Sequence, residues 1–242
     1  MPVSIDGVEW NEGVTMLRKA EFPTLPKNDY PTSDGKPMAE TDLHRELMVD
    51  LIDILQHRYA NDPQVYVSGD LLIFYDQGNK RRHVAPDVFV VFGVPKGRRD
   101  NYLVWDEGKG PDVVIEVTSK STKTEDVKTK PDVFLTKLGV REYFLIDPTQ
   151  DYLDPPLQGF RRVKNEFRPI RFVDGRLPSK VLGLHLERDR DTLRLWNPEL
   201  GAWLPTYAER QAQSDQLRVT AESEVERLRR ENEDLRRKLS GS

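Results

Sequence analysis

Asp87 and Glu116 are the residues whose type and position could do chemistry. Asp87 begins the apolar segment DVFVVFGV, and Glu116 lies inside DVVIEV at 112–117. A carboxylate inside a buried strand is costly unless a cation or hydrogen-bond donors accompany it. Two carboxylates and a backbone carbonyl suit a hard divalent cation such as Mg²⁺, with Mn²⁺ as a second choice. Such an ion lowers the pKa of a bound water and stabilises negative charge on a phosphoryl group.

A lysine beside this pair would orient the nucleophile or the phosphate. Candidates follow Glu116 at Lys120, Lys123, Lys128 and Lys130. Each residue also has an ordinary interpretation. Taken alone, the lysines are typical of a solvated surface, and Asp87 could simply start a strand. His44 could be an ordinary half-buried residue of a helix. A structural lysine or arginine would also satisfy Glu116, although a metal site explains it at least as well.

The elements that position Asp87 and Glu116 can be inferred from the spacing of apolar residues. Helical spacing from Thr41 to about Tyr59 predicts an amphipathic helix, which Thr41 or Asp42 would cap. Runs of β-branched and aromatic residues then predict strands at VYVSG, LLIFY, DVFVVFGV and DVVIEV. DVVIEV is typical of a central strand covered on both faces. We therefore expect adjacent strands to bring the two carboxylates to one edge of a sheet.

The segments on either side complete the outline of one domain. A helix-like stretch ends at Gly139 and leads into a buried strand, EYFLID at 142–147. Residues 148–205 favour short strands and turns, with Asp174-Gly175 as a tight turn, and we expect them to complete the same sheet. Residues 1–38 hold five prolines and three glycines, which predicts an irregular N-terminal arm. Residues 39–206 are predicted to form a mixed α/β domain with a central mixed sheet flanked by helices.

Composition narrows the possible chemistry. The chain has no cysteine, and its four histidines lack the spacing of zinc ligands, so thiolate chemistry is excluded and a zinc enzyme is disfavoured. The net charge of −4 argues against indiscriminate coating of nucleic acid, although local basic clusters could contact a phosphate backbone. We expect a soluble, cytoplasmic protein, because neither a membrane span nor a signal peptide is recognisable. The basic clusters, each also typical of a solvated surface, are Lys80-Arg81-Arg82, Lys96 to Arg99, and Arg161-Arg162-Lys164.

The last segment, residues 207–242, predicts a coiled-coil tail. Its apolar seam is spaced by threes and fours and consists of Val225, Leu228, Asn232, Leu235 and Leu239. An Asn at such a position favours a parallel dimer at some cost in stability. We expect residues 217–239 to form a homodimer or to bind a partner helix. The alternative is a lone solvated helix, because about two heptads are short for independent association.

Three strings together resemble a known family. They are APDVFVV at 85, PDVVIEVTSKST at 111 and GVREYFLIDP at 139, with Asp126, Lys130 and Phe134 between the last two. They resemble the bacterial Uma family of restriction endonuclease-like proteins, in which the strings read approximately PD, PDLVVEVLSPST, D-x-x-x-K, an aromatic residue and GVPEYWLVDP. The resemblance covers residues 40–190, and the aspartate and lysine lie ten and fourteen residues after Glu116, as the family pattern requires.

The resemblance implies a PD-(D/E)XK nuclease, the superfamily to which the Uma family belongs. It implies that Asp87, Glu116 and the Val117 carbonyl bind the metal. The superfamily lysine normally lies two residues after the glutamate, where this chain has Thr118. The resemblance therefore implies that Lys130 has taken over the catalytic role.

Two departures from the family pattern bear on that lysine. Lys120 stands where the family has proline, and Pro131 directly follows Lys130, so the helix must start near Lys130 or kink there. Lys128 and Lys120 therefore remain alternatives for the catalytic amine. His44 matches a polar family position on the first helix, with no role assigned.

These observations favour a metal-dependent endodeoxyribonuclease that hydrolyses DNA phosphodiester bonds by metal-activated water. The alternative is a catalytically silent nuclease-fold protein that acts as a binding or assembly module through its coiled-coil tail. A third class, a magnesium-dependent phosphohydrolase of small nucleotides, would need a closed pocket in place of an open basic groove.

Overall fold

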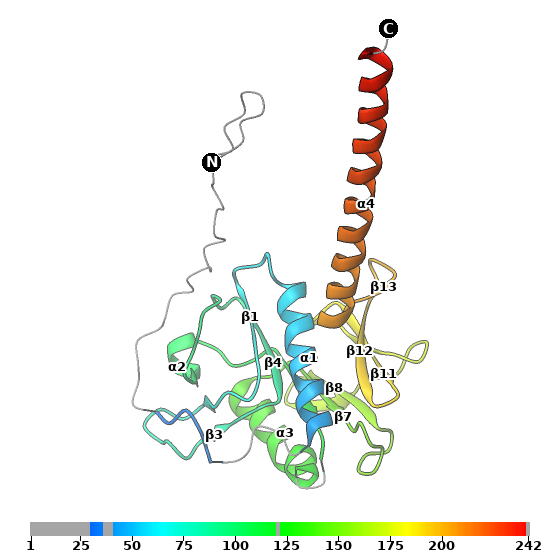
Figure 1. Ribbon diagram of the computed structural model, residues 1–242. Helices are drawn as coiled ribbons and strands as arrows, with labels where there is room; N and C mark the ends of the chain where they lie inside the picture. The colour runs from blue at the N-terminus through cyan, green and yellow to red at the C-terminus, as the bar shows by residue number, and fades with distance from the viewer. Residues whose placement is uncertain (1–29, 36–40, 120–121, 241–242) are drawn as a thin grey trace.

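The computed structural model describes residues 30–35, 41–119 and 122–240. Figure 1 shows a body of strands and helices from which one long helix, α4, projects. Most of the predicted N-terminal arm lies outside the described residues. Within its described part, the Tyr30 ring packs against Phe74 and Trp105, with ring centroids 4.8 and 5.3 Å apart.

A mixed sheet of six strands forms the centre of the body, in the order β1-β4-β6-β7-β8-β9. β6 and β7 run parallel, and the other neighbours pair antiparallel. Every residue of β6 and β7 is buried, which confirms the central strands expected from DVVIEV and EYFLID. The strands are β1 (Val65–Ser68), β4 (Val88–Phe92), β6 (Val113–Val117), β7 (Glu142–Ile146), β8 (Leu157–Val163) and β9 (Glu166–Pro169).

Two smaller sheets accompany the central one. The first contains β2 (Ile73–Phe74), β3 (His83–Val84) and β5 (Tyr102–Leu103). The second contains β10 (Leu177–Ser179), β11 (Leu184–Asp189), β12 (Thr192–Asn197) and β13 (Ala202–Trp203). The expectation that residues 148–205 complete the central sheet is therefore wrong for its second half, since β8 and β9 extend that sheet and β10–β13 do not. The buried leucines of β10–β12 instead pack in the same core as α1.

Helices cover both faces of the central sheet. α1 (Asp42–Arg58) packs residues such as Leu51 against Val88 and Val90 of β4. On the other face, Phe134 packs with the alternate residues Phe89 and Val91, because successive strand residues point to opposite faces. A short helix, α2 (Val104–Glu107), lies near β5. These layers confirm the predicted mixed α/β fold with flanking helices.

The helical segment after β6 changes its winding around Pro131. A π-helical turn, η1 (Glu125–Thr129), precedes the α-helical α3 (Lys130–Val133), and a second π-helical turn, η2 (Phe134–Leu138), follows. Pro131 lies in the first turn of α3, but the Lys130 amide still bonds back to the Glu125 carbonyl of η1, so the helical segment runs on through Lys130. The disturbance expected at Lys130 takes the form of a change from π-helical to α-helical winding, and not of a helix start.

α4 (Tyr207–Ser240) is fixed to the body at its first turn. Glu209 accepts a hydrogen bond from the Thr206 backbone at 2.8 Å and also pairs with Arg194 of β12 at 2.8 Å. Arg210 pairs with Asp53 of α1. From residue 211 to residue 238 every side chain is exposed. In the described part of the chain, no helix has the combination of length and apolar character that crossing a membrane requires.

Candidate functional site

Asp87 and Glu116 lie side by side where β4 and β6 pair. Val88 of β4 lies opposite Ile115 of β6 in an antiparallel pair. Asp87, just before Val88, therefore lies next to Glu116, just after Ile115. Asp87 Oδ2 accepts a hydrogen bond from the Val117 backbone N at 2.7 Å, and Glu116 Oε2 accepts one from the Asp87 backbone N at 3.3 Å. Glu116 is fully buried, whereas the Asp87 side chain keeps 15% of its exposure. Asp87 is therefore the member of the pair that solvent can reach.

Lys130 and Asp126 reach this pair from the helical segment on one face of the sheet. Lys130 Nζ lies 3.0 Å from Glu116 Oε1 and 2.8 Å from Asp126 Oδ1. The spacing of four puts both residues on the same side of the helix, and both are buried. Asp126 was not among the predicted site residues, although the D-x-x-x-K spacing was visible in the sequence. The Tyr143 hydroxyl donates to the Asp126 carbonyl at 2.9 Å and ties this turn to β7.

α1 supplies the remaining member of the cluster, His44. The Thr41 side chain caps the helix by accepting a hydrogen bond from the His44 backbone N at 3.1 Å. The His44 ring is buried, and its Nε2 lies 3.2 Å from Asp87 Oδ1. Residue type alone had indicated an ordinary half-buried helix residue, whereas the structure places the imidazole directly against the candidate carboxylate.

Burial and mutual repulsion dominate the electrostatics of this cluster, which we define as Asp87, Glu116, Asp126, Lys130 and His44. Burial raises the pKa of Glu116 well above its ordinary value, and the neighbouring carboxylates add to the effect while Lys130 opposes it. Burial also raises the pKa of Asp126. Burial acts on Asp87 in the same way, but the hydrogen bond and charge of His44 outweigh it and lower the Asp87 pKa.

Lys130 stays protonated in this environment. Burial alone would lower the pKa of Lys130, but the charges of Glu116 and Asp126 raise it above its usual value. The cluster holds three carboxyl groups against one ammonium, and the raised pKa values of Glu116 and Asp126 mean that their ionised forms have too little positive charge nearby. Buried charges are normally paired or bound to metal ions, so the cluster has room for a further positive charge.

The other residues considered for the catalytic amine lie differently. Lys128 is exposed, and Lys120 lies outside the described residues. Thr118, which stands at the usual superfamily lysine position, is buried, and its hydroxyl has no hydrogen-bond partner among the described residues. Ser119 and Thr122 bond reciprocally, from Ser119 N to Thr122 Oγ1 at 3.1 Å and from Thr122 N to Ser119 Oγ at 3.2 Å. This pair begins the helical segment that carries Asp126 and Lys130.

Two further acidic residues of the quoted strings are fully satisfied by donors. Glu142 accepts from Arg161 Nε at 2.7 Å, from the Ser179 hydroxyl and from two backbone amides. Asp147 accepts from the Leu153 amide at 2.8 Å and from four other donors within residues 149–152. These carboxylates hold loops in place, in contrast to Glu116 and Asp126, which pair with Lys130, and to Asp87, which contacts His44.

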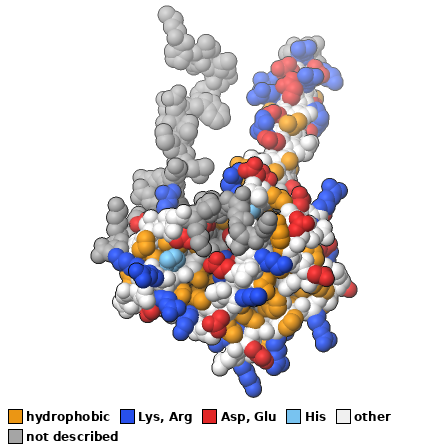
Figure 2. All heavy atoms as spheres, turned by 90° about the horizontal axis from the view of Figure 1, so that it is seen from below, with side chains coloured by type: hydrophobic (Ala, Val, Ile, Leu, Met, Phe, Trp, Pro, Cys, Tyr) orange, Lys and Arg blue, Asp and Glu red, His pale blue; other side chains and the backbone are white. Residues whose placement is uncertain are grey.

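Several of the basic residues predicted to contact DNA are used inside the protein. Arg99 pairs with Glu107 at 2.6 Å and is almost fully buried. The Lys96 ammonium donates to the carbonyls that end α1, and Arg161 is the partner of Glu142. Figure 2 shows that the Lys and Arg side chains visible on that face are spread over it and mixed with acidic ones. Two of the three basic clusters are therefore partly committed to contacts within the protein, whereas Lys80, Arg81 and Arg82 are exposed.

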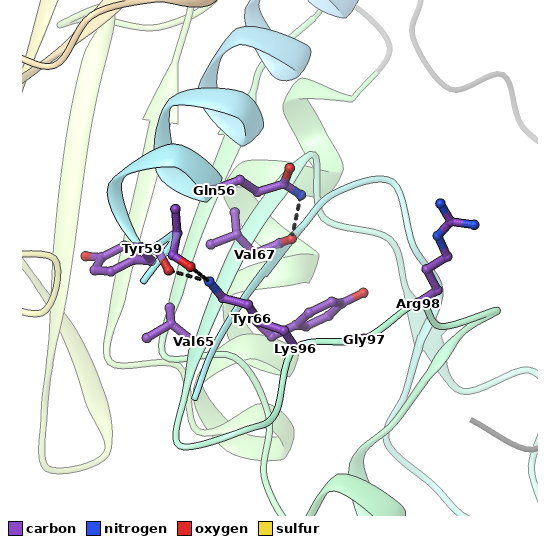
Figure 3. A pocket seen from close by; sticks show the side chains of 9 residues that line it. Gln56, Tyr59, Val65, Tyr66, Val67, Lys96, Gly97 and Arg98 are labelled. Carbon is purple, nitrogen blue, oxygen red and sulfur yellow. Dashed lines mark hydrogen bonds between the residues drawn. The ribbon is translucent and has the colours of Figure 1, made fainter. Parts of the chain in front are cut away.

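A pocket of about 370 Å³ lies at the edge strand β1. In Figure 3 the Gln56 side chain extends from α1 toward β1, and its amide donates to the Val67 carbonyl at 3.1 Å. None of the described residues of the carboxylate cluster lines this pocket. It therefore offers no support for a nucleotide pocket built around Asp87 and Glu116.

The cluster provides oxygen ligands of the kind that hard divalent cations prefer. Among the described residues, no group of three or more His, Cys, Asp or Glu side chains is arranged to hold a metal ion. The donor set expected here is different, with two carboxylates and the Val117 carbonyl. That carbonyl lies on the Asp87 side of β6, because the N–H and C=O of one strand residue face the same neighbour. The residues present and the charge of the cluster fit such an ion.

The fold and the cluster together define a mixed α/β protein with an anionic, lysine-containing centre where two neighbouring strands of its main sheet meet. A family model described as "Uma2: Putative restriction endonuclease" matches residues 17–192. The chain belongs to this family, as its motifs indicated, and the family description is that of a nuclease.

A solved structure with similarity to this chain is described as a putative nuclease belonging to DUF820 from Anabaena variabilis ATCC 29413. The two sequences are 18% identical, the similarity covers 67% of this chain and 90% of that one, and the TM-score is 0.46. A comparison with curated proteins finds no match.

Proposed function

We propose that this chain is a metal-dependent endonuclease that hydrolyses phosphodiester bonds of DNA. The observation that carries the proposal is the cluster itself, in which Glu116 and Asp126 pair with Lys130 and Asp87 contacts His44, so that three buried acidic side chains share one ammonium. A divalent cation bound there would favour the ionised form of all three carboxyl groups. The family description supports the nuclease activity, and DNA is the substrate that a restriction-endonuclease-like protein would cut.

The proposed ligands are Asp87, Glu116 and the Val117 carbonyl, with Mg²⁺ as the expected ion and Mn²⁺ as a substitute. When bound, the ion would lower the pKa of a water molecule and stabilise negative charge on the phosphoryl group. His44 orients Asp87 through the 3.2 Å contact with Oδ1. Because Asp87 is the reachable carboxylate, the substrate approaches from its side of the cluster.

Lys130 is the proposed catalytic amine. Its ammonium lies 3.0 Å from Glu116 and is kept protonated by that residue and Asp126. It would therefore hold a positive charge next to the metal ligands, where it can donate to a phosphate oxygen or to the attacking water. We place this chemistry in residues 39–206 and propose that residues 217–239 bind a second polypeptide.

The experiment that tests the proposal is cleavage of supercoiled plasmid in Mg²⁺, Mn²⁺ or EDTA. Asp87→Asn, Glu116→Gln and Lys130→Ala should each reduce the cleavage rate by about 10²-fold or more, as expected for losing a charge at the reaction centre. Lys128→Ala is the matched control, because this exposed lysine lies two residues before Lys130 on the same helical segment, and it should cut like the wild type.

Each alternative outcome has a definite meaning. If Lys130→Ala remains active while the carboxylate variants fail, the amine is misassigned and Lys120 or Lys128 must supply it. If folded wild-type protein cuts nothing and calorimetry detects no bound divalent ion, the nuclease proposal is wrong. The chain would then be an assembly module that keeps the nuclease fold.

A further inference from the structure

α4 carries an apolar seam that nothing in the described part of the chain covers. Val225, Leu228 and Leu235 are between 48% and 52% exposed, and together with Asn232 they are spaced by three and four. In a heptad register that begins with Val225 at position a, Leu228 and Leu235 fall at d and Asn232 falls at a. Once this register is set, the heptad positions of the neighbouring residues follow from it.

The arginines of α4 divide into two groups in that register. One group has acidic partners within the helix, as Arg227 has with Glu224 at 2.7 Å and Arg230 has with Glu226 at 2.9 Å. Among the described residues, no acidic side chain forms an ion pair with Arg229. Arg236 likewise has none. Both unpaired arginines fall at position e, which flanks the seam.

The charges at position g complement these two arginines. Glu224 and Glu231 fall at g, and in a parallel coiled coil each g residue faces the e residue five positions later on the other helix. In-register pairing of two copies therefore places Glu224 against Arg229 of the second copy and Glu231 against Arg236 of the second copy. Antiparallel pairing would instead bring e against e and g against g, which places like charges together.

We propose that α4 binds α4 of a second copy of this chain as a parallel, in-register coiled coil. Asn232 would then face its own copy, which is the arrangement that favours a parallel dimer. The first turn of α4 is fixed to the body through Arg210 with Asp53 and through Glu209 with Arg194. A parallel pair of helices therefore holds both bodies at the same end of the coiled coil, where two active sites can act on one DNA duplex.

Disulfide trapping tests the geometry directly, because the chain has no cysteine of its own. In full-length Asn232→Cys, oxidation should convert most of the protein to a covalent dimer on a non-reducing gel. Arg230→Cys is the matched control, since that residue lies on the outer face of the helix and should stay monomeric on the same gel. Light scattering of the untreated wild type should give twice the mass of one chain.

Charge exchange separates parallel pairing from other modes of association. Arg229→Glu with Arg236→Glu, and separately Glu224→Arg with Glu231→Arg, should each weaken dimerisation by about tenfold or more, because four interhelical pairs are lost. Mixing the two double variants should restore a dimer that contains one chain of each kind. A wild-type monomer at tens of micromolar, or double variants that dimerise alone but not together, would overturn the proposal. These assays contain no DNA or metal, so they succeed or fail independently of the nuclease proposal.

Discussion

Glu116→Gln tests the charge balance of the cluster, because it removes one negative charge and keeps the size of the side chain. Burial and the carboxylates of Asp87 and Asp126 disfavour the ionised form of Glu116 in the folded protein. Lys130 would keep Asp126 as a partner at 2.8 Å. The hydrogen bond that Glu116 accepts from the Asp87 backbone is long, at 3.3 Å, so its loss costs little. We expect the metal-free variant to be more stable than the metal-free wild type.

The expected difference in stability between Glu116→Gln and the wild type has opposite signs without and with metal. Near neutral pH and in EDTA, replacing Glu116, whose ionised form is disfavoured in the folded protein, with a neutral amide should stabilise the variant by about 1–2 kcal/mol, because a raised folded pKa of a carboxyl group costs stability at that pH. A ligand at about 100 times its Kd stabilises the folded state by about 2.7 kcal/mol. For a chain of this size, that corresponds to a rise of about 5–10 °C in the Tm of the wild type. The order of stability of the two proteins should therefore reverse when Mg²⁺ is added.

Thermal unfolding by calorimetry in EDTA and in Mg²⁺ measures both effects. Glu107→Gln is the control, because Glu107 forms a one-to-one pair with Arg99 away from the cluster and its loss should lower the Tm equally in both conditions. If Glu116→Gln behaves like this control, the pair with Lys130 outweighs the charge excess and the reasoning is refuted. If Mg²⁺ stabilises Glu116→Gln as much as the wild type, the ion binds elsewhere.

Three more changes have defined outcomes. Asp147→Asn should lower the free energy of unfolding by about 2 kcal/mol near neutral pH, because its amide would face two backbone N–H donors. Although burial opposes it, hydrogen bonding lowers the folded pKa of Asp147, so urea titrations should show this deficit shrinking as the pH falls below about 4. His44→Ala should reduce the rate of plasmid cleavage at saturating Mg²⁺ by about 10-fold or more, because Asp87 loses the group that orients it. The charge-reversed tail variants should nick plasmid but yield less linear product than the wild type on agarose gels, and an unchanged ratio would mean that the two sites act independently.

Elements with a strong local pattern were predictable from the sequence. The helix over 42–58 with its Thr41 cap follows from apolar spacing and one capping residue, and the turn at Asp174-Gly175 has the positive φ values of 50° and 78° that such a pair favours. The meeting of Asp87 with Glu116 was also predictable, because each lies at the end of an apolar strand and the two strands are neighbours.

Features that depend on distant contacts were not predictable in the same way. The alternation of apolar and polar residues in β10–β12 predicts that one face is covered, but it does not show that this face packs into the core that α1 shares with the central sheet. The π-helical turns on either side of α3 are likewise invisible to a pattern that records only proline and apolar spacing. In both cases the missing information is which segments pack together.

Whether a buried acidic residue can act chemically also depends on which distant segments pack against it. Glu116 and Glu142 are both fully buried carboxylates in apolar strands, and their local sequences are alike. The donors that satisfy Glu142 come from residues 19 to 39 positions away. At Glu116, the pairing of β4 with β6 brings the carboxyl group of Asp87, and the folding of the helical segment brings that of Asp126 together with Lys130. A buried acid becomes a structural anchor or a reactive centre according to the charges that the tertiary fold delivers to it. The proposed function therefore rests on the acidic side chains and the lysine that the tertiary fold brings to Glu116, and metal binding is the property that tests it.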